Sequence, residues 1–271
     1  ERCRSFFHDP EYKALPEHSI TLETALNKDV LFASWYERNV AAHKKPGYAI
    51  VTISVKKTGS PPGDIDSSQM RFVADIADRY SFGEMRIAHT QNIVLADVEK
   101  DKLYELWQAL RSYDLDADNL GLLSDIICCP GGDFCSLANA KSIPVAEAIQ
   151  RRFTHEELRD IGKVSLNISG CMNACGHHHV GNIGILGVDK KGEEFYQISL
   201  GGSADNQAAL GKIVGPSFSQ EEVPDVISKI VEVYKQNRTD GEEFLATYNR
   251  IGMDPFKTAL YGSKADDKQA D

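Results

Sequence analysis

The sequence predicts an α+β protein in which a small α/β sandwich, residues 47–118, precedes a larger α/β unit, residues 119–258. Three observations carry this prediction. Strand and helix patterns follow one another as β-α-β-β-α in the first stretch, and a second series of such patterns follows. A glycine-rich stretch with four cysteines interrupts the second series. The chain has 271 residues and 42% apolar content, enough for one large or two small globular domains.

Residues 1–46 are predicted to form an N-terminal arm that carries one helix. From Thr21 onward apolar side chains recur at helical spacing, and the hydroxyl of Ser19 or Thr21 can cap this helix. Pro46 and Gly47 then break the chain. The expected apolar face of the helix consists of Leu22, Leu26, Val30, Ala33, Trp35 and Tyr36.

Residues 47–118 are predicted to form a split β-α-β sandwich, which is ferredoxin-like in topology. Alternating residues rich in Ile, Val and Thr predict strands at 48–55, 85–88 and 93–96. Apolar residues at helical spacing predict two helices, one of which starts after Ser67. Their expected buried residues are Met70, Val73, Ile76, Ala77 and Tyr80, and then Leu103, Leu106, Trp107 and Leu110.

Residues 119–258 are predicted to form the larger α/β unit, and residues 259–271 a flexible, Lys- and Asp-rich tail. Pro144 is expected to kink the first helix of this unit. Ile126 and Ile127 lead into the first cysteine pair. The expected elements are a helix at 138–149, a strand at 164–168, a hairpin of strands 183–188 and 195–200, a weakly ordered stretch at 203–208, and two late helices with Val226, Ile230 and Val233, and with Phe244, Tyr248 and Ile251.

Four cysteines fall into two pairs within the larger unit. Cys129 and Cys135 are separated by five residues, and Cys171 and Cys175 by three. Each pair lies among glycine, proline and asparagine, so its loop can turn tightly and direct several sulfur atoms to one place. Four thiolates surrounded by backbone N–H groups are what a four-iron cluster requires. The pairs therefore indicate one iron–sulfur cluster.

Two other interpretations of these cysteines stay open. Disulfides are disfavoured because a chain of this size can bury a core large enough to be stable without them. Zinc is the stronger alternative, since three histidines, residues 177–179, follow Cys175, although a five-residue gap is loose for a zinc knuckle. Cys3 and Cys128 fit neither pair and are expected to be buried or incidental thiols.

The charge balance limits the possible partners. The net charge of −10 argues against nucleic acid, and no apolar run is long enough to predict a membrane span. Free cysteines in exposed loops suit a reducing compartment, so the cytoplasm is expected.

The cysteine region resembles a known family. A Cys-x5-Cys pair, followed by Gly-Cys-x-Asn-x-Cys-Gly, is similar to the signature of sulfite and nitrite reductases that contain sirohaem and a 4Fe–4S cluster. The similarity extends from Tyr48 to Phe256 and includes the runs RIAHTQNIVLADV and YQISLGG. The chain resembles the second, cysteine-bearing half of the family's polypeptides, and it begins with Glu1 rather than Met.

This resemblance implies a function. Residues 119–258 would bind sirohaem and the cluster, with Cys129, Cys135, Cys171 and Cys175 as cluster ligands and Cys175 shared with the sirohaem iron. The reaction would be the six-electron reduction of sulfite to sulfide or of nitrite to ammonia, with a ferredoxin or a flavoprotein as electron donor. The N-terminal half of the same reductase would be a partner that supplies the substrate-binding Arg and Lys residues, so this chain alone is expected not to turn over.

Polar and basic residues are needed near such a site, because the cluster, the macrocycle carboxylates and the substrate are all negative. Glycines beside the cysteines would let backbone amides approach the cluster: Gly131, Gly132, Gly170 and Gly176. The candidate cofactor-binding residues are Arg86, Gln91, Asn92, Asn173, His177, Lys141 and Lys212.

Two competing functions remain at this stage. One is a structural zinc-binding or interaction domain without redox activity, and the other is an electron-transfer subunit with a cluster but no haem. Metal and sulfide analysis would separate the first from a reductase, and haem absorption bands would separate the second.

Overall fold

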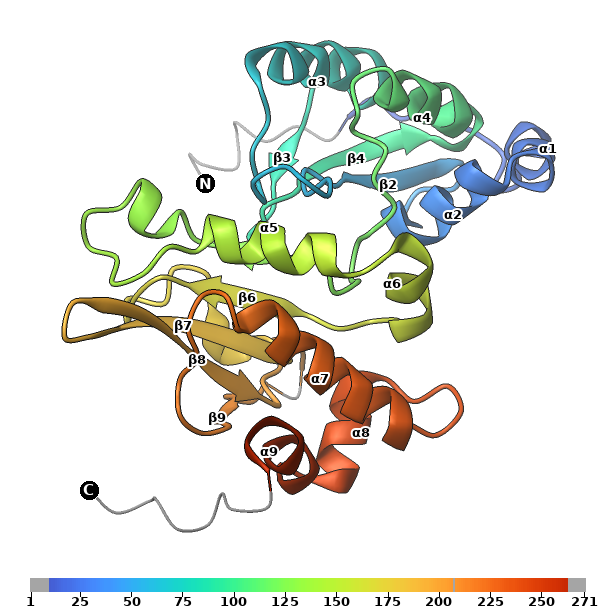
Figure 1. Ribbon diagram of the computed structural model, residues 1–271. Coiled ribbons are helices and arrows are strands. Elements are labelled where there is room, and N and C mark those ends of the chain that lie inside the picture. The colour runs from blue at the N-terminus through green and yellow to red at the C-terminus, as the bar shows by residue number, and fades with distance from the viewer. Residues whose placement is uncertain (1–9, 207, 263–271) are drawn as a thin grey trace, which may run out of the picture. The chain divides into compact units, whose positions relative to one another are not determined.

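The computed structural model describes residues 10–206 and 208–262 and divides into two compact units (Figure 1). Unit 1 comprises Glu1–Val55 and Ile65–Asp118, and unit 2 comprises Lys56–Asp64 and Asn119–Asp271. Each unit has its own hydrophobic core. None of the helices in these ranges is both long and apolar enough to span a membrane.

Unit 1 is a four-stranded antiparallel sheet in the order β1-β2-β4-β3, with helices packed against it through one core. Figure 1 shows α3 and α4 lying along the same face of this sheet. The predicted β-α-β-β-α order is confirmed as β2-α3-β3-β4-α4. The elements are α1 (Ile20–Lys28), α2 (Val30–Asn39), β1 (Val40–Ala42), β2 (Tyr48–Ile53), α3 (Ser67–Tyr80), β3 (Arg86–Ile87), β4 (Ile93–Glu99) and α4 (Leu103–Arg111), with a 3-10 turn at Lys100–Lys102.

The single helix predicted for the arm is two helices. Asp29 has extended backbone angles, and its side chain accepts hydrogen bonds from the amides of Leu31 and Phe32, so it ends α1 and caps α2. Ser19 caps α1, as predicted. The break turns Val30 outward, where it is 82% exposed, whereas Trp35 is fully buried in the core of unit 1.

Two further apolar side chains of unit 1, Met70 and Ile87, are exposed to solvent. Met70 was predicted to be buried but is 55% exposed, because it lies in the first turn of α3, beside the Asp66–Gln69 capping box. Ile87 is 73% exposed, because β3 is a two-residue strand at the edge of the sheet.

Unit 2 is a five-stranded mixed sheet in the order β5-β6-β7-β8-β9. The first three strands are parallel to one another, and the last three are antiparallel. Helices α5 and α7 pack on each other and share the core with the sheet. The elements are β5 (Ile127–Cys128), α5 (Ile143–Arg152), α6 (His155–Ile161), β6 (Leu166–Ser169), β7 (Ile183–Lys190), β8 (Glu193–Leu200), β9 (Lys212–Ile213), α7 (Val223–Asn237), α8 (Phe244–Ile251) and α9 (Asp254–Tyr261), with 3-10 turns at Gly131–Asp133 and His178–Val180.

Two predictions for this unit were wrong in detail. Pro144 does not kink a helix, because α5 begins at Ile143 and Pro144 lies in its first turn, where no N–H is needed. The predicted flexible tail from 259 includes the end of α9, and 263–271 lie outside the described residues. The weakly ordered stretch at 203–208 stays a prediction: its first residue, Ser203, pairs with Ala209 in an isolated bridge, and residue 207 lies outside the described residues.

Residues 56–64 belong to unit 2, although they follow a strand of unit 1. The Lys56 side chain is fully buried, and its Nζ lies 2.7 Å from Oδ1 of Asp125. The side-chain amide of Asn119 donates to the Lys56 carbonyl at 3.0 Å. Burial lowers the pKa of Lys56, and Asp125 acts in the opposite direction. A buried ion pair therefore fixes this segment to the start of unit 2.

Candidate functional site

Two neighbouring parallel strands deliver the two cysteine pairs. Strand β5 pairs with β6 in a parallel register that places Cys128 opposite Ile168. Cys129 follows the end of β5, and Cys171 follows β6 after one residue. The carboxyl ends of adjacent parallel strands lie at the same edge of a sheet, where α/β proteins generally bind ligands. The first and second cysteine loops, residues 129–142 and 170–182, therefore emerge side by side.

Hydrogen bonds join these two loops. The Gly170 amide donates to Sγ of Cys129 at 3.0 Å. In return, the Gly170 carbonyl accepts from the amides of Asn139 and Ala140, at 2.8 and 3.1 Å. Cys129 also donates its own amide to the Ile168 carbonyl at 3.1 Å. The second pair thus begins next to the first cysteine sulfur.

The first cysteine loop places Cys135 on a short turn. The Phe134 amide donates to the Gly131 carbonyl at 3.2 Å and closes the 3-10 turn at Gly131–Asp133, and the Cys135 amide donates to the same carbonyl at 2.9 Å. Cys135 is half-buried and Cys129 is buried. Two large apolar side chains of this loop face solvent, since Phe134 is 79% exposed and Leu137 is 70% exposed.

The second cysteine loop carries two residues in the left-handed backbone region. Ala174 has φ 56° and His177 has φ 53°, which is uncommon for residues other than glycine and costs about 1–2 kcal/mol each. Cys171 is buried, whereas Cys175, between these two residues, is exposed. Met172 is 82% exposed. The backbone is therefore strained where the last cysteine faces outward.

Two buried polar side chains of β6 hold the second loop. The Asn167 amide group donates to the carbonyls of Gly176 and His177 at 2.9 and 3.3 Å. The Gly176 amide donates to Oγ of Ser169 at 3.1 Å. These two residues were not identified from the sequence. The signal was their polarity in an otherwise apolar strand that directly precedes Cys171.

The adjacent Cys128 differs from the four paired cysteines. It is 4% exposed, and its sulfur donates to the Cys129 carbonyl at 3.2 Å. Burial raises the pKa of the Cys128 thiol well above its usual range, so Cys128 stays protonated. The expectation of a buried Cys128 is confirmed, and Cys3 lies outside the described residues.

The His, Cys, Asp and Glu side chains are the possible ligands of a zinc ion or of a four-iron cluster. Among residues 10–206 and 208–262, no three His, Cys, Asp or Glu side chains lie close enough together to hold one metal ion. A closed zinc site requires four ligands about 2.0–2.3 Å from a single ion. A four-iron cluster keeps its thiolates farther apart and also accepts amide hydrogen bonds, such as the one from Gly170 to Cys129. The Gly170 amide therefore gives Cys129 the kind of donor that a cluster ligand has, and the four paired cysteines are the residues that would hold a cluster.

The basic candidates of unit 2 lie at different places. Nζ of Lys141 is 3.7 Å from Oδ1 of Asp133, which belongs to the first cysteine loop. The Lys141 backbone is also anchored, because its amide donates to Glu194 and its carbonyl accepts from the Tyr196 hydroxyl. Lys212 is exposed on β9. Strand β9 pairs with β8 and forms the edge of the sheet opposite β5.

The three histidines and Asn173 differ in exposure. His177 and Asn173 are exposed. His178 is 3% exposed, and burial lowers its pKa to about 4, so it is neutral at pH 7. The ring centroids of His178 and His179 lie 3.8 Å apart, and the two ring planes are tilted by 46°. Of the three, His178 is therefore the buried one, whereas His177 and His179 are exposed.

The other candidates, Arg86, Gln91 and Asn92, belong to unit 1. Arg86 is exposed on β3 and pairs with Glu84, with Nε 2.6 Å from Oε1. Gln91 has φ 59° in the turn between β3 and β4. Asn92 is buried, and its side-chain oxygen accepts from the Val55 amide at 3.3 Å, so it has a structural role within unit 1.

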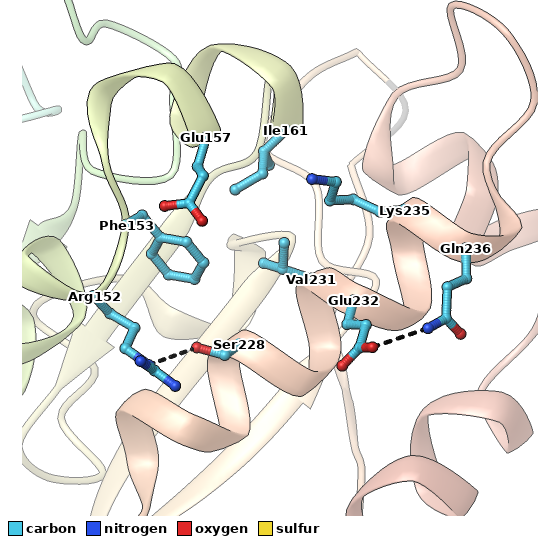
Figure 2. A pocket seen from close by; sticks show the side chains of 9 residues that line it. All are labelled: Arg152, Phe153, Glu157, Ile161, Ser228, Val231, Glu232, Lys235 and Gln236. Atoms are coloured by element: carbon cyan, nitrogen blue, oxygen red, sulfur yellow. Dashed lines mark hydrogen bonds between the residues drawn. The ribbon is translucent and has the colours of Figure 1, made fainter.

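A pocket of about 480 Å³ opens elsewhere in unit 2, along α6 and α7 (Figure 2). Its wall carries both charge signs, and hydrogen bonds join Arg152 to Ser228 and Gln236 to Glu232. The lining residues include no cysteine and none of the candidate site residues. They are Arg152, Phe153, Glu157, Ile161, Ser228, Val231, Glu232, Lys235 and Gln236.

The fold and the paired thiols define an iron–sulfur domain joined to a ferredoxin-like half domain. Comparison with family models agrees. Residues 122–268 match the nitrite and sulphite reductase 4Fe-4S domain, and residues 42–113 match the nitrite/sulfite reductase ferredoxin-like half domain. The first match covers more than half of the chain. The chain therefore belongs to the nitrite and sulfite reductase family of oxidoreductases.

Curated relatives are similar at low identity. The chloroplastic ferredoxin--nitrite reductase of Spinacia oleracea is 27% identical over 81% of this chain and 37% of that protein. The sulfite reductase (ferredoxin) 1 of Mycolicibacterium paratuberculosis is 27% identical over 67% of this chain and 35% of that protein. The chain thus spans little more than a third of these relatives.

Solved structures share the fold. The Mycobacterium tuberculosis NirA protein superposes with a TM-score of 0.66 at 23% identity, covering 80% of this chain and 41% of NirA. Dissimilatory sulfite reductase I superposes with a TM-score of 0.64 at 15% identity, covering 78% of this chain and 68% of that chain. The predicted α+β class with a ferredoxin-like sandwich is confirmed by these likenesses.

Proposed function

We propose that this chain is the cofactor-binding part of a sirohaem-dependent sulfite or nitrite reductase. Cys129, Cys135, Cys171 and Cys175 hold a 4Fe–4S cluster, and Cys175 is shared with the sirohaem iron. When bound, the two groups together supply the electron storage and relay for a six-electron reduction of the anion. Ferredoxin, which the names of the relatives mention, or a flavoprotein donates the electrons, and the cytoplasm remains the expected compartment.

What carries this conclusion is the hydrogen bond from the Gly170 amide to Sγ of Cys129, at 3.0 Å. It brings the start of the second pair to the first pair, and it stabilises negative charge on the sulfur. The exposed Cys175 faces outward with the exposed Met172, where a flat macrocycle could lie against apolar side chains. His177, Asn173 and Lys141 are the unit 2 residues proposed to contact its carboxylates.

We propose the domain division that the two family matches support. Residues 47–118 form the ferredoxin-like subdomain, and residues 119–258 form the sirohaem and cluster-binding domain, to which residues 56–64 contribute. Arg86 and Gln91 of the subdomain are proposed to contact the macrocycle, and Lys212 to contribute positive charge. The arm, residues 1–46, contributes Phe32 and Trp35 to the core of unit 1.

Anaerobic reconstitution of the 271-residue chain is expected to load about four irons and four sulfides per chain. Replacing Cys129 or Cys171 with alanine is expected to lower both contents at least about tenfold, because a ligand is lost. Iron and acid-labile sulfide are measured chemically on the desalted protein. Added sirohaem should then give haem absorption bands.

The matched control is Cys128→Ala, which removes a thiol from the adjacent position. Cys128 is buried and protonated, so this variant is expected to keep its iron and sulfide. Equimolar zinc without sulfide in the unmodified chain, or equal iron contents in Cys128→Ala and Cys129→Ala, would contradict the assignment.

The chain alone is not expected to reduce sulfite or nitrite. It spans 37% of the spinach relative, and we propose that the substrate-binding Arg and Lys residues lie in the complementary half of the reductase. A steady-state assay with reduced ferredoxin should give a background rate for the loaded chain and a higher rate when that half is supplied. Equal rates in the two assays would refute the proposal that the complementary half supplies the substrate-binding residues.

A further inference from the structure

A fully buried serine lies against the first cysteine sulfur. Ser142 is 0% exposed, and its Oγ lies 3.4 Å from Sγ of Cys129. The same sulfur accepts the Gly170 amide at 3.0 Å. A thiolate has no proton to give, so in a metal-bound Cys129 the hydroxyl of Ser142 must be the donor. The sulfur then accepts two hydrogen bonds from the protein.

The position of Ser142 in the chain shows that its hydroxyl does not serve the helix. Ser142 is the N-cap residue of α5, where a serine side chain usually accepts from a helix amide. Here it makes no capping hydrogen bond, and its backbone angles, φ −109° and ψ −42°, are not those of a capping residue. Pro144 also removes one of the amides that it could have accepted. The hydroxyl is therefore left for the sulfur.

Two glycines enclose this hydroxyl. A β-carbon added to Gly131 would lie 2.8 Å from Oγ of Ser142, and one added to Gly170 would lie 3.0 Å from it. Gly131 belongs to the first cysteine loop and Gly170 to the second. The two loops thus close around Ser142 where only glycines leave room, and the hydroxyl has a fixed position.

We propose that Ser142 is a positioning residue that donates a hydrogen bond to the Cys129 thiolate and raises the reduction potential of the cluster, a role that rests on the function proposed above. One-electron reduction adds negative charge to the cluster, and part of that charge resides on the thiolate sulfurs. A donor to sulfur therefore stabilises the reduced form more than the oxidised form. Burial of both side chains strengthens the effect.

The test is the midpoint potential of the cluster, measured by anaerobic redox titration with electron paramagnetic resonance detection. Ser142→Ala is expected to shift the one-electron equilibrium about three- to tenfold toward the oxidised form, a fall of about 30–60 mV. Ser142→Gly removes the same hydroxyl and, like alanine, adds no atom to this enclosed position. The cluster of the glycine variant should show a fall in potential of similar size.

Ser199→Ala is the control for removal of a buried hydroxyl. Ser199 is 7% exposed, and its Oγ faces the Gly184 carbonyl rather than a sulfur. The midpoint potential of the cluster in Ser199→Ala should equal that in the unmodified protein. Unchanged potentials in Ser142→Ala and Ser142→Gly at full iron content would overturn this role for Ser142. Failure of the unmodified chain to load iron and sulfide would instead refute the function on which it rests.

Discussion

Replacing Lys56 with methionine is expected to lower the free energy of unfolding of unit 2 by about 3–5 kcal/mol. The Lys56 side chain is fully buried, and its ammonium group lies 2.7 Å from Asp125. Asp125 has a side chain that is only 14% exposed. Removal of the cation leaves a carboxylate in a poorly hydrated place without its counter-charge, and this uncompensated charge dominates the expected loss.

The two units can be followed separately in this experiment. The chain contains two tryptophans, Trp35 and Trp107, and both belong to the core of unit 1. In urea, tryptophan fluorescence therefore reports unit 1, whereas far-UV circular dichroism reports both units. For Lys56→Met, the dichroism transition of unit 2 should move to lower urea, and the fluorescence transition should stay where it is.

Lys163→Met is the matched control, because it removes a surface ion pair from the same unit. Nζ of Lys163 lies 4.0 Å from Glu243, and the two side chains are 69% and 60% exposed. Such a pair contributes at most about 1 kcal/mol. If Lys56→Met cost no more than this control, the buried pair would not hold residues 56–64 in place.

The strands next to the cysteines could be predicted because the pattern of apolar residues within each strand is enough to identify it. The alternation around Leu166 and Ile168 gave β6, and two apolar stretches around a four-residue turn gave β7 and β8. The short elements α6 and β9 were missed, because seven and two residues are too few to show a period.

Other features depended on partners that are distant in the sequence. Nothing local shows that Lys56 would pair with Asp125, so the sequence did not predict that residues 56–64 pack with unit 2. In the sequence, Asp29 fits the polar face of one continuous helix, whereas in the structure its side chain caps α2. A capping residue changes the direction of the chain without changing its hydrophobic pattern.

The contact between the two cysteine loops could be predicted from the sequence, whereas the polar side chains that hold the loops could not. The spacing of the four cysteines and their glycines predicted that the two loops would meet, and the loops do contact each other at Gly170. Asn167, Ser169 and Ser142 fix those loops, but each is a common polar residue whose role depends on where it points. The glycines also differ in role, since the Gly176 amide serves Ser169 rather than a sulfur.

Gly176→Ala is expected to abolish cluster binding while leaving the core of unit 2 folded. A β-carbon at this position would lie 1.9 Å from the carbonyl oxygen of Ile168 and 2.8 Å from its carbonyl carbon, a collision with backbone that no side-chain rotation can relieve. The second cysteine loop would have to lift off β6 and lose the hydrogen bonds from Asn167 and to Ser169. Because Gly176 directly follows Cys175, the displaced residue is a proposed ligand.

Iron and sulfide contents after anaerobic reconstitution measure this effect, and far-UV circular dichroism verifies the fold. A fall of at least about tenfold in both contents is expected, since a misplaced ligand of a four-thiolate site weakens binding strongly. Gly132→Ala is the matched control in the first cysteine loop, because the Gly132 amide donates to the Ala140 carbonyl rather than to a sulfur, and an added β-carbon would lie no closer than 3.5 Å to the atoms around it. That variant should load fully. Full loading of Gly176→Ala as well would mean that close contact between the second loop and β6 is not what positions Cys175.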